Sequence, residues 1–153
     1  GALILNNSTI SDNRRDPPSA SSIAGTNVDS GTVVFRNSVI ANSIGGRGCK
    51  VGPGVVKHQY GNNWFEDASC NTIPQGDPGL APLANNGGPT LTHALLPGSP
   101  LIDAGDEASC AIASIGNIDQ RGIKRPQGAR CDIGAFELEQ GGFMVIPFLN
   151  GIT

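Results

Sequence analysis

Glycine and proline interrupt the stretch from Asp77 to Glu137 every few residues, and this punctuation limits what the chain can fold into. The whole sequence of 153 residues holds 22 glycines and 11 prolines, with few aromatic residues and one methionine. Because proline lacks a backbone donor and glycine destabilises helix interiors, a long helix is excluded here. The stretch predicts short extended pieces joined by tight turns. We expect one domain with a sizeable core.

Isolated charged residues lie among the small apolar residues of the same stretch. Such residues usually close a structural network, in which a carboxylate holds an arginine or accepts turn N–H groups. A catalytic network is the alternative, but the spacings of known catalytic motifs are absent. We therefore expect Arg121 and Arg125 to pair with nearby carboxylates. The candidate members of this network are Asp103, Asp119, Arg121, Arg125, Asp132 and Glu137.

The first half of the chain contains a repeat. Residues 3–13 match residues 33–43 at an offset of 30, each with an apolar triplet, an Asn-Ser bend and an apolar pair. A weaker third copy spans residues 58–67 and is offset by 25 from the second, which places Phe65 under Ile40. Units this small cannot bury their own apolar faces, so we expect them to stack as a solenoid. Three unrelated hairpin strands are the alternative interpretation.

The repeat places an asparagine at the bend of each unit, at Asn7, Asn37 and Asn62. Amide side chains stacked in a column can bond to one another and to the turn backbone, and asparagine tolerates the left-handed conformation. We therefore predict an asparagine ladder in which the three residues occupy equivalent corners of successive units.

Several short motifs follow the repeats in a fixed order. They are Asp77-Pro78, residues 86–96, Ser99-Pro100, residues 102–105, residues 119–122, Arg125-Pro126 and residues 132–137. In order and spacing they closely resemble the C-terminal module of bacterial right-handed parallel β-helix proteins of the choice-of-anchor Q type, which often carry an N-terminal CSLREA motif. The resemblance is dense over residues 77–137 and looser over residues 1–76.

This resemblance implies an all-β fold, a short right-handed parallel β-helix with a loop-rich C-terminal cap. Residues 1–76 would form the stacked units with surface loop excursions. Residues 77–140 would cap the open C-terminal end, and residues 141–153 would add an apolar β-prone tail to the same structural domain. The resemblance also implies a secreted or cell-surface bacterial protein, and it brings no established reaction.

Four cysteines fall into two pairs, Cys49 with Cys70 and Cys110 with Cys131, each 21 residues apart. Four cysteines allow three pairings, and we predict the two local disulfides, each closing a loop-rich segment. An extracytoplasmic location agrees with oxidised cysteines. A zinc site is the alternative, although neither pair has the close spacing that zinc usually requires.

Charge and hydropathy exclude some partners. The net charge is −3 and no basic stripe occurs, so nucleic acid is not expected as a partner. No apolar run approaches the ~20 residues of a membrane-spanning helix. The sequence has neither an initiator methionine nor a signal peptide, so we expect a mature or trimmed fragment whose export signal lies outside these residues.

Carbohydrate binding or polysaccharide cleavage is the main alternative function, since many β-helices cleave glycans. Glycosidases need two facing carboxylates, and the repeat units carry few acids. We expect His93 to be a packed, hydrogen-bonded residue and Trp64 or Phe65 to lie in the core, with sugar stacking by an exposed Trp64 as the alternative.

We therefore predict no catalytic residue, no enzyme activity, and no cofactor or metal. Calcium is the one metal kept as an alternative, because carboxylates in glycine-rich loops suit it. Its candidate ligands are Asp77, Asp103, Asp106 and Asp119.

The predicted function is a structural or adhesive component of a bacterial cell-surface or extracellular assembly. Leu3 and Leu5 belong to an opening strand with an unpaired edge, and Phe143 and Val145 to the apolar tail behind a Gly-Gly hinge. Strand addition between copies would give a head-to-tail homo-oligomer, which extends as a filament unless it closes a ring. Alternatively, upstream residues continue the first unit and the tail folds back. A surface glycan or another protein is the further partner that this function allows.

Overall fold

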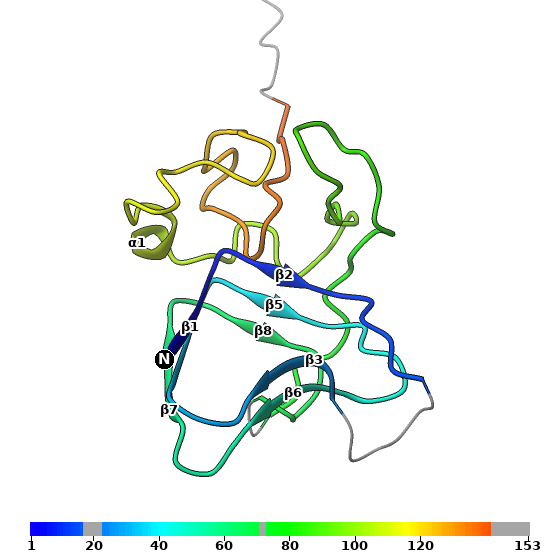
Figure 1. Ribbon diagram of the computed structural model, residues 1–153. Helices are drawn as coiled ribbons and strands as arrows, with labels where there is room; N and C mark the ends of the chain where they lie inside the picture. Colours follow the sequence, from blue (N-terminus) through cyan, green and yellow to red (C-terminus); the bar gives the residue numbers. More distant parts are fainter. Residues whose placement is uncertain (17–22, 71–72, 142–153) are drawn as a thin grey trace, which may run out of the picture.

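A computed structural model describes residues 1–16, 23–70 and 73–141 of the chain (Figure 1). The described residues are mostly strands, with a single short helix, α1 (Glu107–Cys110). The strands are β1 (Ala2–Asn6), β2 (Thr9–Ile10), β3 (Ile23–Val28), β4 (Thr32–Arg36), β5 (Val39–Ile40), β6 (Arg47–Val51), β7 (Val56–Tyr60) and β8 (Trp64–Phe65). The predicted all-β class is therefore confirmed. No described helix has the length and apolar character needed to cross a membrane.

The strands belong to three successive units, and each unit pairs with the next. Unit one holds β1, β2 and β3, unit two holds β4, β5 and β6, and unit three holds β7 and β8. The sheets have the orders β1-β4-β7, β2-β5-β8 and β3-β6, and all of these pairs are parallel. Because hairpin neighbours would be antiparallel, the alternative of three unrelated hairpin strands is wrong.

Alternate side chains of the units point into one apolar core. Leu3 and Leu5 of β1 pack beside Val33 and Phe35 of β4, as expected from the period of two in a strand. The Phe35 ring meets the Phe65 ring edge to face, with centroids 5.3 Å apart. Phe65 pairs with Ile40 as the repeat predicted. The core thus runs through all three units.

A second apolar cluster joins β5 to the C-terminal segment, which we define as residues 77–137. Val39 and Ala41 are buried against Leu101, Ile133 and Phe136 of this segment. Consecutive residues of a strand face opposite sides, so Ile40 enters the first core while Val39 faces the second. The sheet β2-β5-β8 is therefore covered on both faces.

The C-terminal segment, which we predicted to cap the open end of the units, lies along their side and contacts all three of them. It contacts unit one where the Ala135 N–H donates to Thr9 Oγ1, and unit two where the Gly134 N–H donates to the Asn37 carbonyl. It contacts unit three where Asn62 Nδ2 donates to the Ala104 carbonyl. Figure 1 shows the segment beside β2, above the sheets. The reason is the apolar outer face of β5, which needs cover as much as the open end does.

Other residues close the end of unit three. The Gln75 N–H donates to the Phe65 carbonyl, and the Gly76 N–H donates to the Glu66 carbonyl. The indole N–H of Trp64 donates to the Gly76 carbonyl at 2.8 Å. Residues 75 and 76 thus occupy the free side of β8, while β7 stays exposed along its whole length.

The corner after the first strand of each unit needs a left-handed backbone. Asn7 and Asn37 both have φ of 43°, and Gly61 has φ of 62° at the third corner. Because Arg36 pairs with Tyr60, the residue below Asn37 is Gly61, and the predicted position of Asn62 is wrong by one residue. A Cβ at Gly61 would lie 2.7 Å from Asn37 Oδ1, so only glycine fits beneath that side chain.

Candidate functional site

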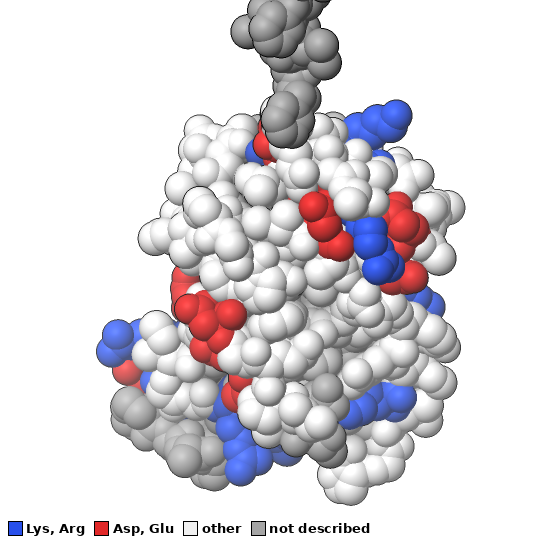
Figure 2. Space-filling view, turned by 180° about the vertical axis from the view of Figure 1, so that it is seen from behind, with Lys and Arg blue, Asp and Glu red and all other residues white. Residues whose placement is uncertain are grey.

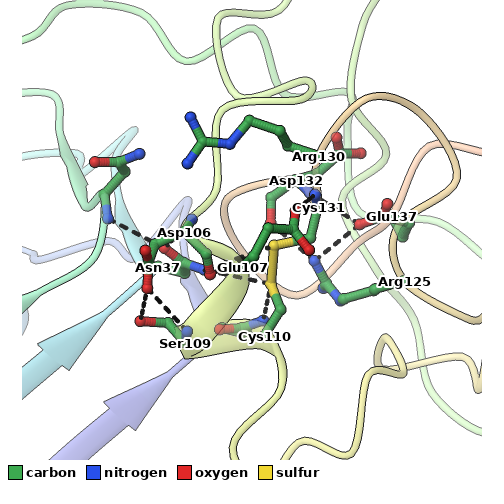
Figure 3. Close-up of a disulfide and its surroundings, with 12 residues drawn as sticks. Asn37, Asp106, Glu107, Ser109, Cys110, Arg125, Arg130, Cys131, Asp132 and Glu137 are labelled. Atoms are coloured by element: carbon green, nitrogen blue, oxygen red, sulfur yellow. Dashed lines mark hydrogen bonds and ion pairs between the residues drawn. A yellow bond between two sulfur atoms is a disulfide. The ribbon is translucent and has the colours of Figure 1, made fainter.

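The two predicted disulfides, Cys49–Cys70 and Cys110–Cys131, are both present and confirm the local pairing. Cys49 and Cys70 lie in the core of the stacked units. Cys110 and Cys131 are fully buried where the C-terminal segment meets the unit corners (Figure 3). Each disulfide can stabilise the folded protein by about 3 kcal/mol, because it restricts the unfolded chain.

Asn37 is the centre of that meeting point (Figure 3). Its Oδ1 accepts the Asp106 N–H at 2.9 Å and the Asn62 N–H at 3.1 Å, and its Nδ2 donates to the Asp106 carbonyl at 2.9 Å. The Nδ2 groups of Asn7 and Asn37 both approach Cys110 Sγ, at 3.2 and 3.3 Å. The asparagines therefore bind the C-terminal segment and the next corner, and no bond between their side-chain amides occurs in the described structure.

The residues around Asn37 also fix α1. Asp106 caps the helix, since its carboxylate accepts the Ser109 N–H at 2.9 Å. Glu107 Oε1 accepts the Cys131 N–H at 2.6 Å. Sequence reasoning missed the part that Asp106 and Glu107 play here. The available signal was the acid-rich start of a helical turn just before a cysteine, Asp106-Glu107-Ala108-Ser109-Cys110.

Arg125 and Glu137 form a fully buried ion pair. The distance from Arg125 Nη1 to Glu137 Oε2 is 3.0 Å, and the two side chains are 0% and 1% exposed. Arg125 also donates to the carbonyl oxygens of Asp132 at 2.8 Å and Gly134 at 2.7 Å. The guanidinium thus fixes the last loop of the segment from inside.

Arg121 forms the second pair, with Asp119. Arg121 Nη2 lies 2.8 Å from Asp119 Oδ2, and the Arg121 side chain is only 6% exposed. The same nitrogen donates to the Glu137 carbonyl at 2.5 Å, and the guanidinium lies 3.7 Å from the centre of the Phe136 ring. Stacking on the ring and pairing with the carboxylate both favour arginine over lysine here.

The buried carboxylates also accept backbone N–H groups. Glu137 accepts from Gln127 at 2.8 Å and from Asp132 at 2.9 Å. Asp132 accepts from Asp103 at 2.7 Å and from Leu138 at 2.6 Å. We call Asp119, Arg121, Arg125, Asp132 and Glu137 the buried network, and it confirms that Arg121 and Arg125 pair with carboxylates of this stretch.

Asp103 is the exception among the predicted members. Its carboxylate accepts the Arg130 backbone N–H at 3.1 Å and the Gln140 side-chain N–H at 2.8 Å, so it makes no ion pair with Arg121 or Arg125. Asp103 has φ of 54°, a left-handed conformation that directs it into a turn on the surface.

Burial shifts the pKa values of three members of the buried network. Loss of water raises the pKa of Asp132 and of Glu137, and the hydrogen bonds that each carboxylate accepts offset only part of this effect. Loss of water likewise lowers the pKa of Arg125, against the attraction of Glu137. The network is therefore held by geometry and hydrogen bonds at a cost in desolvation.

The aspartates considered for calcium do not converge. Among the described residues, no group of three or more histidine, cysteine, aspartate or glutamate side chains is arranged to hold a metal ion. Asp77 accepts the Gly79 N–H, and Asp119 accepts the N–H groups of Arg121 and Ile123, so each serves its own turn. The set Asp77, Asp103, Asp106 and Asp119 therefore does not form one site.

His93 is packed and hydrogen-bonded, as predicted. Its side chain is 8% exposed, and Nδ1 lies 2.8 Å from the Ala81 carbonyl and 3.7 Å from Asp12 Oδ2. Since the Ala81 carbonyl can only accept, it holds Nδ1 as the protonated nitrogen. Trp64 packs against the second apolar cluster, and Phe65 is buried in the first.

Only one of the two predicted assembly strands lies within the described residues. Leu3 and Leu5 lie in β1, at one edge of the sheet β1-β4-β7, with side chains turned to the core. Phe143 and Val145 lie outside the described residues.

Comparison with known proteins gives no relative, because no family model, curated protein or solved structure matches the chain.

Proposed function

We propose that the chain is a structural or adhesive component of a bacterial cell-surface or extracellular assembly. In this proposal the three units are turns of a short right-handed parallel β-helix of the choice-of-anchor Q type. The observation that carries the proposal is the open edge of unit one, where β1 and β2 each end their sheet without a further strand among the described residues.

The hydrogen bonds of β1 define this edge. The Gly1 carbonyl accepts the Thr32 N–H and the Asn7 N–H donates to the Arg36 carbonyl, so the odd-numbered residues of β1 bond to β4. Backbone groups alternate in direction along a strand, so the N–H and C=O of Ile4 point away from unit two. The same reasoning directs the groups of Thr9 in β2 away from β5. The Ile4 side chain lies on the outer face of β1, opposite to Leu3 and Leu5, and the residue is 53% exposed.

The interior chemistry supports a structural role over catalysis. Arg121 and Arg125 donate to buried carboxylates and to backbone carbonyls of the C-terminal segment, so both guanidinium groups stabilise the loops of that segment. Two disulfides support an oxidising location outside the cytoplasm. We propose that the chain is not an enzyme. The buried carboxylates bind arginines and backbone N–H groups, and the acidic side chains on the face drawn in Figure 2 lie in separate small groups, which favours a structural role over carbohydrate cleavage.

We propose a second copy of the chain as the partner at the open edge. A strand that adds to β1 of a neighbour would give a heterologous contact, which builds a filament unless the rotation closes a ring. The tail beyond residue 141 is the proposed donor strand, and residues 142–153 lie outside the described residues.

Sedimentation velocity over a range of protein concentrations tests this proposal. The intact chain should form larger species as concentration rises. Ile4→Pro, which removes the outward N–H, should stay monomeric, while Ile4→Ala, which keeps that N–H, should still assemble. A chain that lacks residues 141–153 should also stay monomeric if the tail is the donor. An intact chain that remains monomeric at high concentration, or an Ile4→Pro variant that assembles equally well, would show that the edge is not used.

A further inference from the structure

A cleft of about 390 Å³ lies between unit three and the C-terminal segment. Its side from unit three comes from the end of β7 and the corner before β8, and its other side comes from Pro100, Ala104 and Ile133. Among the described residues, no charged side chain lines it. The side chains that dominate its lining are the amides of Gln59, Asn62, Asn63 and Gln75, together with the Trp64 indole and the Pro100 ring.

The fold fixes three of these four amides, two of them at one end and one at both ends. Asn62 Nδ2 donates to the Ala104 carbonyl at 2.7 Å, and Gln75 Oε1 accepts the Phe65 N–H at 2.8 Å. Each can therefore offer its other end to a ligand in a fixed direction. Asn63 is held at both ends, since Oδ1 accepts the Ser38 N–H and Nδ2 donates to the Tyr60 carbonyl. Gln59 is exposed, and among the described residues its side chain makes no hydrogen bond.

This lining matches the chemistry of a sugar. A side-chain amide offers a donor and an acceptor together, which suits the neighbouring hydroxyl groups of a pyranose. The indole and the proline ring offer flat apolar surface for the C–H face of the ring. A binding site that combines apolar surface with a few fixed polar groups is the usual form of a small-ligand pocket. Because the cleft has no charged lining, an uncharged ligand avoids burying an unpaired charge there.

We infer that the cleft between Gln59, Asn62, Trp64, Gln75 and Pro100 binds a neutral glycan. The inference rests on the adhesive form of the proposed function and names its partner class. It is independent of strand addition at β1, which involves unit one rather than unit three.

Trp64 is the only tryptophan of the chain, so its fluorescence reports on this cleft directly. The full chain is titrated with the neutral hexasaccharides of glucose, mannose, galactose and N-acetylglucosamine, and with hexagalacturonate as an acidic probe. At least one neutral hexasaccharide should change the Trp64 emission with a saturable curve, and hexagalacturonate should bind more weakly.

Variants locate the ligand. Gln59→Ala should weaken binding of the responding sugar by roughly 3- to 10-fold, the value of one net hydrogen bond. Gln120→Ala is the matched control, because Gln120 is an exposed amide outside this cleft, and it should leave binding unchanged. Gln59 is exposed, so Gln59→Ala should keep the melting temperature of the parent. Gln120→Ala loses the hydrogen bonds from Gln120 Nε2 to Thr90 and Leu91, so it should lower the melting temperature slightly, and binding by both variants is measured well below their melting temperatures.

Three outcomes would overturn the inference. They are no fluorescence change with any neutral hexasaccharide up to millimolar concentration, equal weakening by Gln59→Ala and Gln120→Ala, and a response to an extended Gly-Ser peptide without a response to any sugar. The last would assign the cleft to polypeptide. The sedimentation experiment uses variants of β1 and the tail, whereas the titration uses variants of Gln59 and Gln120. A failure of sugar binding therefore does not contradict assembly through β1, and a failure of assembly does not contradict sugar binding.

Discussion

Removal of the buried Arg125 charge should destabilise the protein strongly. The Arg125→Met variant keeps most of the side-chain length but leaves the Glu137 carboxylate, 1% exposed, without its partner at 3.0 Å. The carbonyl oxygens of Asp132 and Gly134 also lose their donors. Breaking a buried pair by removing one member costs about 3–5 kcal/mol. For a chain of this size that corresponds to a fall in Tm of roughly 6–20 °C.

A second variant separates charge from packing. In Arg125→Met with Glu137→Gln, the unpaired charge is gone, and the amide oxygen can still accept one of the N–H groups of Gln127 and Asp132. This double variant should therefore be more stable than Arg125→Met alone, although less stable than the parent. Arg130→Met is the control, since Arg130 is exposed, and it should change the free energy of unfolding by less than about 0.5 kcal/mol.

Urea unfolding followed by circular dichroism measures these free energies at pH 7. The deficit of Arg125→Met should shrink at low pH, because protonation of Glu137 removes the unpaired charge. The reasoning is refuted if Arg125→Met melts within about 2 °C of the parent, or if the double variant is no more stable than the single one.

Three further predictions concern neighbouring parts of the molecule. Arg121→Ala should lower the free energy of unfolding by about 3 kcal/mol or more, since Asp119 is then buried without its cation, and a Tm equal to the parent's would show that this pair does not stabilise the fold. Asn37→Ala should cost about 2–4 kcal/mol, because the Asp106 and Asn62 N–H groups lose their acceptor at a corner with φ of 43°, whereas a cost below about 1 kcal/mol in a urea melt would refute its central place. Burial raises the pKa of Asp132 and Glu137 in the folded protein above their ordinary values of 3.8 and 4.5. The folded state therefore binds their protons more tightly than the unfolded state does, and this contribution to the free energy of unfolding is fully present below the ordinary pKa values and is lost as the pH rises through the raised pKa values. Urea melts at pH steps from 4 to 7 should show falling stability, and a steady rise with pH would contradict this assignment.

The parts of the fold that the sequence predicted are those with local or periodic causes. The repeat at Asn7 and Asn37 predicted parallel pairing because the same pattern of apolar residues and the same left-handed bend recur at a fixed offset. The cysteine pairs were predicted from their equal spacing, and the pairing of Arg121 and Arg125 from the isolation of charges among small apolar residues.

The parts that could not be predicted depend on contacts between distant residues. The third unit carries one extra residue at its corner, which Gly61 makes possible, so sequence alignment alone misplaced Asn62. The position of the C-terminal segment follows from the apolar outer face of β5, to which Val39 belongs. Because β5 has only two residues, Val39 and Ile40, its sequence is too short to show an alternating pattern that would predict this face. The cleft beside Trp64 is lined by Gln59 and Pro100, which lie far apart in the sequence, and no sequence motif links the two positions.

Residue-level hydrogen exchange of the β1 backbone tests the central claim most directly. The amide of Ile4 points to the open edge, whereas the Asn7 amide donates to the Arg36 carbonyl at 2.8 Å. In dilute monomer, the Ile4 and Thr9 amides should exchange quickly while Asn7 is protected. As the protein assembles at higher concentration, the Ile4 amide should become protected by at least about tenfold and Asn7 should change little. An Ile4 amide that stays unprotected in assembled protein would contradict assembly through this edge.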